Sequence, residues 1–442
     1  ENGILLPILV GVLELTVVAS QPGRFPALNR AWAALFIVLP TVVVVAYLGA
    51  QFFRGDFLEV VPPRDFSLYE RLLTQGRVLA EYLQHWFLPK LYTTGVFQDH
   101  FIKSTGLLQP VTTIAGIALH AAALAFAFLK RRQLPLVSVA ILFFYASHLL
   151  ESTTVNLELY FEHRNYLAAA LLFLPLVELL ERKLPARSFV LASAVLLMLV
   201  GGFTRYSANV WRSLPSMVEL SALKAPTSAR AQSQFAKLLF YHQRHDAALA
   251  VIDQAIAVIP HDDPLLLTNR LYFLCSTNSL GNGDYDAMAD RVSRLPFDIQ
   301  ATKPYNQFAQ EVVDGRCPNI RVEQVEALFT RMLEMPHNGN ASSPEYSHIQ
   351  FLIGYMRMHA RRPDAALSAF EASLDAKPEP AHAMMMAEQL ASTGYRQQAL
   401  QLAARARALL DAGTADNPRR ARGISSADID GFEEQVRRNT WK

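Results

Sequence analysis

Polar and ionisable side chains gather in two stretches that border apolar segments, and their residue types could do chemistry. One stretch contains Asp99, His100 and Lys103, and the other lies within residues 148–166. Carboxylates beside histidine can transfer protons, and Arg or Lys can bind a phosphate through charge-assisted hydrogen bonds. Because ionisable groups near bilayer depth are costly, such clusters indicate a functional site. The candidate lipid-phosphate or substrate-binding residues are Arg77, Glu81, Asp99, His100, Lys103, Glu162, His163, Arg164 and Tyr166.

For each of these residues there is also a purely structural alternative, such as Glu162 pairing with Arg164 to cap a helix. Asp99, His100 and His163 are metal-ligating types, but no spacing among them fixes a coordination geometry, so we predict no metal. The sequence has no Gly-rich phosphate loop, no Cys-x-x-Cys pair, no His-Glu-x-x-His and no Gly-x-Ser-x-Gly elbow. It therefore carries no signature of a soluble enzyme, and we expect no cofactor.

The composition of the chain changes near residue 204. Of 442 residues, 51% are hydrophobic and 18% are charged, against about 25% charged in a typical soluble protein. Of the 41 Lys/Arg and 39 Asp/Glu residues, 28 lie in residues 1–204 and the other 52 in residues 205–442. This division excludes a single soluble domain and a disordered chain. A formal net charge of +2 excludes nucleic-acid binding driven by bulk charge.

Six apolar segments approach the length of about 20 residues that a bilayer-spanning helix needs. They are Ile4–Ser20, Ala31–Phe52, Val111–Leu129, Leu134–Leu150, Tyr166–Leu180 and Arg187–Thr204. Short basic loops follow the first, third and fifth segments, so these loops are cytoplasmic by the positive-inside rule. The loops of mixed charge, and all residues after 204, then face outside. We expect an integral protein of a bacterial inner membrane in contact with membrane lipid, with its second half in the periplasm.

The long outer loop contains one more helical pattern, from Ser67 to Leu88. Its apolar residues recur at helical spacing. The opposite face is polar and carries Glu70, Thr74, Arg77, Glu81 and Gln84. Because that face is costly in hydrocarbon, we expect residues 67–88 to form an amphipathic helix at the outer membrane interface. The alternative is a helix that packs across the bundle.

Residues 205–410 show paired amphipathic helices with a period of about 34 residues, which is typical of tetratricopeptide repeats. Small residues and a closing proline recur in three copies: Ala236, Ala248, Ala255 and Pro260; Gly354, Ala366, Phe370 and Pro378; Ala387, Gly394, Ala399 and Ala406. Between Pro264 and Tyr346 the register is degenerate. The predicted fold class is all-α, a polytopic transmembrane helix bundle in residues 1–204 followed by a tetratricopeptide-repeat-like α-solenoid. Such arrays bind a protein or peptide partner.

Cys275 and Cys317 are the two cysteines, and both belong to the half expected outside. An oxidising compartment would allow one disulfide closing a loop of about 40 residues, and two buried thiols are the equal alternative. Residues 411–442 are expected to form a solvated or frayed tail.

Several stretches together resemble one family. The segment Arg64–Lys103 is similar to an outer-loop segment of the transmembrane and tetratricopeptide-repeat O-mannosyltransferases, which have GT-C-type bacterial relatives. Phe161–Leu167 resembles the Phe-Glu-His-Arg-Asn-Tyr-Leu-Pro-Ser motif of those relatives, except that Ala168 and Ala169 stand in place of Pro-Ser. The opening Glu1–Pro7 is similar to the end of another family motif. The likeness extends from residue 1 to about residue 410.

The resemblance implies an enzyme that transfers a sugar from a polyprenyl-phosphate donor to a protein or glycan acceptor on the extracytoplasmic face. Arg77, Lys103 and Arg164 would pair with the lipid phosphate, and Glu162 and Asp99 would orient these cations or the sugar. The family's catalytic acid lies in its first outer loop, which is not among these residues.

We therefore expect this chain to be the C-terminal portion of such a glycosyltransferase, inactive alone and without the catalytic residue. The alternative function is a non-catalytic, membrane-anchored scaffold whose repeats recruit partners for pilus or surface-polysaccharide assembly.

Overall fold

The structure is a computed structural model that describes residues 2–21, 29–53, 57–58, 60, 66–88, 96–416 and 424–440, without side chains for 413–416. All ordered elements in this described part are helices, and no strand occurs among them. The all-α prediction is therefore confirmed. The chain divides into a first unit, Glu1–Ala225, and a second unit, Pro226–Lys442. The division falls after residue 204 because the helix that contains Thr204 continues to Trp211 and the next helix, Leu214–Lys224, packs against it.

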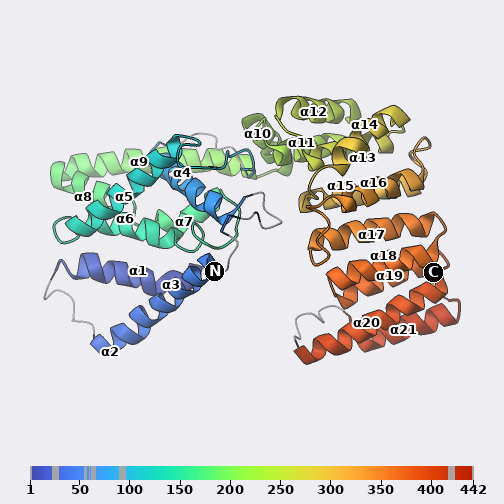
Figure 1. Cartoon of the computed structure of the whole chain (residues 1–442). Helices are drawn as coiled ribbons and strands as arrows, with labels where there is room; N and C mark the ends of the chain where they lie inside the picture. The colour runs from blue at the N-terminus through green and yellow to red at the C-terminus, as the bar shows by residue number, and fades with distance from the viewer. Residues whose placement is uncertain are drawn as a thin grey trace. The chain divides into compact units, whose positions relative to one another are not determined.

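The first unit contains ten α-helices among its described residues (Figure 1). They are α1 Leu6–Leu13, α2 Arg30–Ala33, α3 Leu39–Phe52, α4 Leu68–Phe87, α5 Thr112–Lys130, α6 Pro135–His148, α7 Asn165–Ala168, α8 Leu174–Lys183, α9 Ala186–Trp211 and α10 Leu214–Lys224. A π-helical turn, Ala34–Val38, joins α2 to α3 just before Pro40, which has no backbone N–H to continue the regular ladder.

Three helices of the first unit are long and apolar enough to cross a membrane, namely Arg30–Phe52, α5 and α9. Of their most apolar stretches, only 11%, 22% and 0% of the residues are buried inside the protein. Large exposed apolar surfaces mark sites of contact with a membrane or with another protein. Two shorter apolar helices, Gly3–Val18 and Pro135–His148, correspond to the predicted first and fourth segments.

The fifth predicted segment, Tyr166–Leu180, is not one helix, so that expectation is wrong. α7 ends at Ala168, and α8 begins only at Leu174 with Pro175 in its first turn. Pro175 lacks the N–H that a continuous helix needs at this position, but a proline is tolerated where a new helix starts. The break leaves residues 161–168 as a short, compact segment beside α6.

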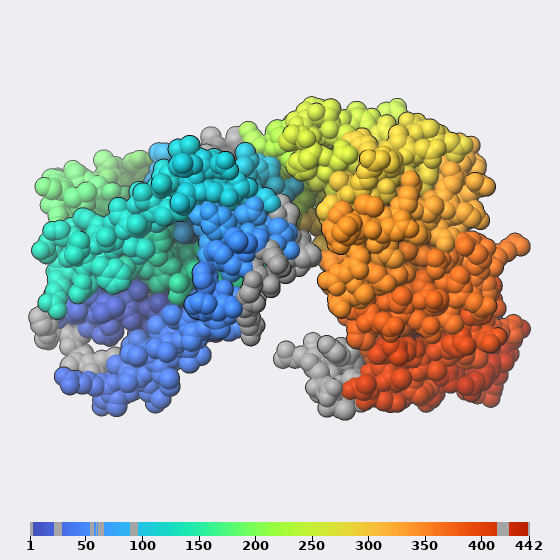
Figure 2. Space-filling view, viewed as in Figure 1, coloured from blue at the N-terminus to red at the C-terminus, as the bar shows by residue number. Residues whose placement is uncertain are grey.

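The second unit consists of paired helices that stack one after another along the chain (Figure 1). They are α11 Ala229–Tyr241, α12 His245–Val258, α13 Pro264–Ser276, α14 Asn282–Ser293, α15 Thr302–Val313, α16 Val322–Glu334, α17 Pro344–His359, α18 Pro363–Ala376, α19 Pro380–Ser392, α20 Arg396–Asp416 and α21 Ser426–Arg437. One continuous core of buried side chains runs through them. Figure 2 shows one face of these helices in space-filling form.

Small residues lie where paired helices meet, as the sequence pattern predicts. Ala236, Ala248 and Ala366 are fully buried. A Cβ at Gly354 on α17 would approach the Phe370 ring of α18 to 2.5 Å, so this position requires glycine. In the degenerate stretch between Pro264 and Tyr346 the pairing changes: α13 packs mainly against α15, and α16 packs mainly against α17. The apolar residues of this stretch still lie in the core.

The expected tail, residues 411–442, is not a frayed end in its described part, because it contains the helix α21. Ser425 and Asp428 form a capping box that starts α21. Ile429 and Phe432 of α21 are buried in the core of the unit, and Arg407 on α20 binds Asp430 at 2.7 Å. An apolar stripe at helical spacing therefore seals the last pair of helices, whereas residues 417–423 lie outside the described residues.

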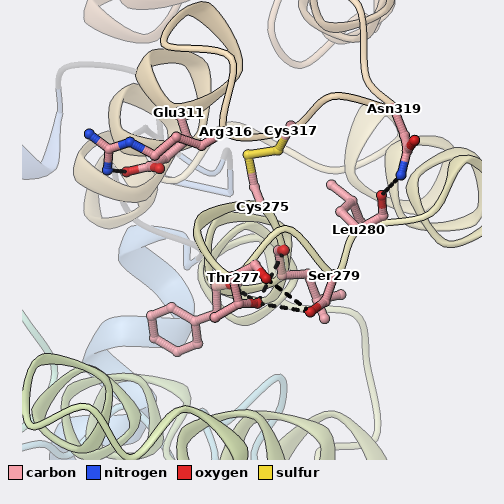
Figure 3. Close-up of a disulfide and its surroundings, with 10 residues drawn as sticks. Cys275, Thr277, Ser279, Leu280, Glu311, Arg316, Cys317 and Asn319 are labelled. Carbon is pink, nitrogen blue, oxygen red and sulfur yellow. Dashed lines mark hydrogen bonds and ion pairs between the residues drawn. A yellow bond between two sulfur atoms is a disulfide. The ribbon is translucent and has the colours of Figure 1, made fainter.

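Cys275 and Cys317 form a disulfide between the end of α13 and the segment after α15 (Figure 3). Their Cα atoms are 5.0 Å apart, within the range that a disulfide requires. Beside it, Asn319 donates to the Leu280 carbonyl at 3.2 Å and Arg316 binds Glu311 at 3.0 Å. Of the two alternatives left open by the sequence, the paired cysteines are the one present.

Candidate functional site

α4 positions much of the candidate site, and its start is fixed by a capping box. The Ser67 hydroxyl accepts from the Glu70 N–H at 3.2 Å, and the Glu70 carboxylate accepts from the Ser67 N–H at 2.9 Å. α4 then crosses α5 at Gly76 and Gly116, where a Cβ at Gly116 would lie 2.5 Å from the Gly76 carbonyl oxygen. The helix expected at residues 67–88 is present over Leu68–Phe87 and packs against α5, while its position at the outer membrane interface stays a prediction.

Arg71 on α4 is buried, with 1% of its surface exposed, and its guanidinium organises the segment after α6. Nε donates to the Thr153 carbonyl at 2.9 Å, and the terminal nitrogens donate to the carbonyls of Glu151, Leu157 and Glu158. The planar guanidinium of Arg71 thus provides hydrogen-bond donors for several backbone carbonyls of residues 151–158, which are not in a helix. This arrangement fixes the path of residues 151–158 against α4.

Tyr82 lies about three turns after Arg71 on α4, and it binds the second polar stretch at residue 161. Its hydroxyl donates to the Phe161 carbonyl at 2.8 Å and accepts from the Phe161 N–H at 2.9 Å. Its ring stacks on those of Tyr160 and His148. Asn165 donates to the Tyr82 carbonyl at 3.3 Å and lies 3.4 Å from His148 Nε2. These bonds set the orientation of residues 161–165.

Arg164 is the most enclosed of the candidate cations. Its Nε lies 3.6 Å from Glu151 Oε2, and the side chains of Arg164 and Glu151 are only 10% and 11% exposed. Its guanidinium also donates to the Glu158 carbonyl at 2.5 Å and lies over the Phe161 ring, 5.0 Å from its centre. A buried pair of this kind is costly to break, because the partner charge would remain without compensation.

Arg77 and Lys103 occupy different local settings. Lys103 Nζ lies 3.7 Å from the capping carboxylate of Glu70. Arg77 donates one N–H to the Ile102 carbonyl at 2.6 Å and lies over the Phe101 ring at 4.9 Å. Among the described residues, the remaining N–H groups of Arg77 have no hydrogen-bond acceptor. Of the candidate cations, Arg77 therefore keeps the most donor capacity.

The other predicted residues are only partly brought together. Gln98 donates to Glu162 at 3.3 Å, which joins the stretch containing Asp99 and His100 to the stretch after residue 161. His163 and Tyr166 are exposed, with Tyr166 83% exposed.

Glu81 lies 3.6 Å from His85 on its own helix. Within the described ranges, no group of three or more His, Cys, Asp or Glu side chains has a metal-binding arrangement, and Asp99, His100 and His163 form none.

Arg71 is the site residue that the sequence analysis missed. It lies at helical spacing from Gln75, Val78 and Tyr82, which are all buried. These residues form a stripe distinct from the predicted polar face. One feature of the sequence could have identified Arg71. Arg71, Gln75 and Tyr82 are long hydrogen-bonding side chains on the same helical face as the apolar Val78, and this pattern indicates that they are buried and bind backbone groups.

Comparison with known proteins assigns no family to this arrangement. Neither a protein-family model nor a curated protein sequence matches the chain.

Proposed function

We propose that this chain is part of an integral-membrane glycosyltransferase, with the transmembrane and tetratricopeptide-repeat architecture predicted above. It transfers a sugar from a polyprenyl-phosphate donor to a protein or glycan acceptor on the extracytoplasmic face of a bacterial inner membrane. Two features support membrane insertion. Three long apolar helices have little protein cover, and the two shorter apolar helices α1 and α6 pack together in one core cluster with α3.

The disulfide supports the orientation of the second unit. Disulfides persist in the periplasm and other oxidising compartments, whereas cytoplasmic thiols are kept reduced. Cys275 and Cys317 are paired in the second unit, which the positive-inside rule independently assigns to the outside. Residues 97–104 and 151–166 follow the same rule and would lie on that side as well, near the lipid headgroups.

The observation that carries the proposal is that Arg77 keeps N–H groups without an acceptor among the described residues. It lies beside the polar stretch that Gln98 connects to Glu162. A lipid phosphate needs charged donors with free N–H groups, and Arg suits phosphate because its donors form a planar fork. Arg77 retains such donors, while its contacts to Ile102 and Phe101 hold it in place. Glu162, held by Gln98, is the nearby carboxylate proposed to orient the sugar. Lys103 and Arg164 would bind the lipid phosphate only if it replaced their present carboxylate partners, Glu70 and Glu151.

The test is complementation of a gene deletion in the host, followed by intact-mass measurement of envelope proteins and a profile of surface glycans. Wild type should restore the mass of a hexose or pentose, and Arg77→Gln should not. Arg182→Gln is the matched control, because Arg182 lies in the last turn of α8, its side chain is 74% exposed, and its ion-pair partner among the described residues is Glu178. Equal membrane levels of each variant must be verified. Full restoration by Arg77→Gln and by Glu162→Gln would refute the transferase site.

A scaffold function is favoured by one specific observation, the internal pairing of Lys103 with Glu70 and of Arg164 with Glu151. If these pairs are purely structural, deletion of the gene should leave every glycan mass unchanged. The assembly of pili or surface polysaccharide should then be lost instead.

A further inference from the structure

Basic side chains gather at one end of the first unit, around the connections that follow α5 and α8. They are Lys130, Arg131, Arg132, Arg182, Lys183 and Arg187, and the last two turns of α8 also carry Glu178 and Glu181. α6 packs against both α5 and α8, and α8 packs against α9. The two connections therefore lie at the same end of the unit (Figure 1), which has an excess of positive charge.

This basic end is separated from the candidate site by the length of α5. The hydroxyls of Ser104 and Thr113 lie 2.8 Å apart at the start of α5, whereas Lys130 is its last residue. With 19 residues, α5 is about 28 Å long, close to the hydrocarbon thickness of about 30 Å. When α5 crosses a membrane, the basic end therefore lies at the level of the lipid headgroups on the other side.

Half of these cations already have partners within the described structure, which are Gln133, the carbonyl of Phe128 and Glu178. Arg132, Lys183 and Arg187 have no hydrogen-bond or ion-pair partner there, and all three are exposed. Three cations thus remain available to an anion that comes from outside the protein.

Two helix N-termini add to this positive end. α6 and α9 both begin here, and neither has a side-chain cap or an acidic residue in its first turn. The N-terminus of a helix carries a partial positive charge and presents backbone N–H groups, which together favour phosphate. Three unpaired cations and two such N-termini offer more positive charge than one phosphate monoester would neutralise.

Exposed apolar side chains lie directly beside the basic residues on all three helices. Leu129 on α5 is 79% exposed, Leu179 on α8 is 53% exposed, and Val190 on α9 is 65% exposed. α8 buries none of its own residues, although it packs against α6 and α9. Inorganic phosphate would leave this apolar surface uncovered, whereas the acyl chains of a phospholipid would cover it.

We propose that this end of the first unit binds an anionic phospholipid with two phosphate groups. Its phosphates lie on Arg132, Lys183 and Arg187 at the N-termini of α6 and α9, and its acyl chains cover the apolar faces of α8 and α9. Basic sites between membrane helices suit such headgroups. The inference needs membrane insertion, but it does not depend on sugar transfer at the other end of α5.

The test uses the full chain purified in an uncharged detergent, and native mass spectrometry measures the bound lipid during a titration. Cardiolipin, which has two phosphates, should bind about ten-fold more tightly than phosphatidylcholine, which has no net charge. The double variant Arg132→Gln/Arg187→Gln should weaken cardiolipin binding about ten-fold, because it removes two cations from the headgroup site. Each connection keeps two basic residues, so the charge bias that orients the helices remains.

Arg205→Gln/Arg212→Gln is the matched control, because it removes two exposed cations near the opposite end of α9 and should bind cardiolipin like wild type. Without lipid, both double variants should unfold at the wild-type temperature, since all four side chains are exposed.

Three results would overturn the proposal. One is equal affinity for cardiolipin and phosphatidylcholine, and another is unchanged cardiolipin binding by a folded Arg132→Gln/Arg187→Gln variant. The third is complete displacement of cardiolipin by inorganic phosphate at the same phosphate concentration, which would show a general anion site in place of a lipid site.

Discussion

Gly116→Ala is the sharpest test of how α4 is positioned. The added Cβ would lie 2.5 Å from the oxygen and 2.9 Å from the carbon of the Gly76 carbonyl. Both atoms are backbone, so no side chain can rotate away. The same carbonyl accepts a hydrogen bond from His120 Nε2 at 2.7 Å, and this bond ties α4 to α5. The two helices must therefore separate, and α4 carries both Arg71 and Arg77.

The expected loss of stability follows from three terms. Overpacking costs about 1–3 kcal/mol, and loss of the bond from His120 costs about 0.5–1.5 kcal/mol. Alanine returns about 1 kcal/mol through its better helix propensity. The net loss is about 0.5–3.5 kcal/mol, which corresponds to a decrease in Tm of roughly 1–14 °C for a unit of this size.

Thermal unfolding of the full chain in detergent, followed by tryptophan fluorescence, measures this loss. Trp86 lies near the end of α4 and reports on the affected helix. Gly202→Ala on α9 is the matched control, because nothing lies within 4 Å of the added Cβ, and this variant should unfold with wild type or slightly later. If Gly116→Ala unfolds with wild type, the close crossing of α4 and α5 is wrong.

Two further predictions concern the second unit. Replacing Cys275 and Cys317 by serine should lower its stability by about 4 kcal/mol through loop entropy, and a reducing agent should lower the Tm of wild type but not of this variant. Burial lowers the pKa of His348 to about 4, with the positive charges of His382 and Lys377 contributing. The unfolded chain binds this proton more strongly, so stability falls as the pH drops from about 6.5 to 4. His348→Gln should lose less Tm than wild type between pH 7 and pH 5, and an identical loss would contradict this assignment.

Local sequence patterns were sufficient to predict most of the helices and the presence of paired helices in the second unit. Alanines at fixed spacing predict close helix contacts, and Ala236, Ala248 and Ala366 are indeed fully buried. Local patterns were less informative where a few residues start or interrupt a helix within a segment of otherwise uniform composition. Pro175 divides an apolar segment that hydropathy treats as continuous, and a short capping box with an apolar stripe converts part of an expected tail into α21.

The sequence by itself determined the all-α fold class, the contrast between the two halves and the long apolar helices, because these depend on composition and on the period of neighbouring residues. It also identified the residue types of the candidate site. Only the tertiary structure decided which of them have partners, since a hydrogen bond joins residues far apart in sequence. Arg71 binds carbonyls 80 to 87 positions away, and Arg164 pairs with Glu151.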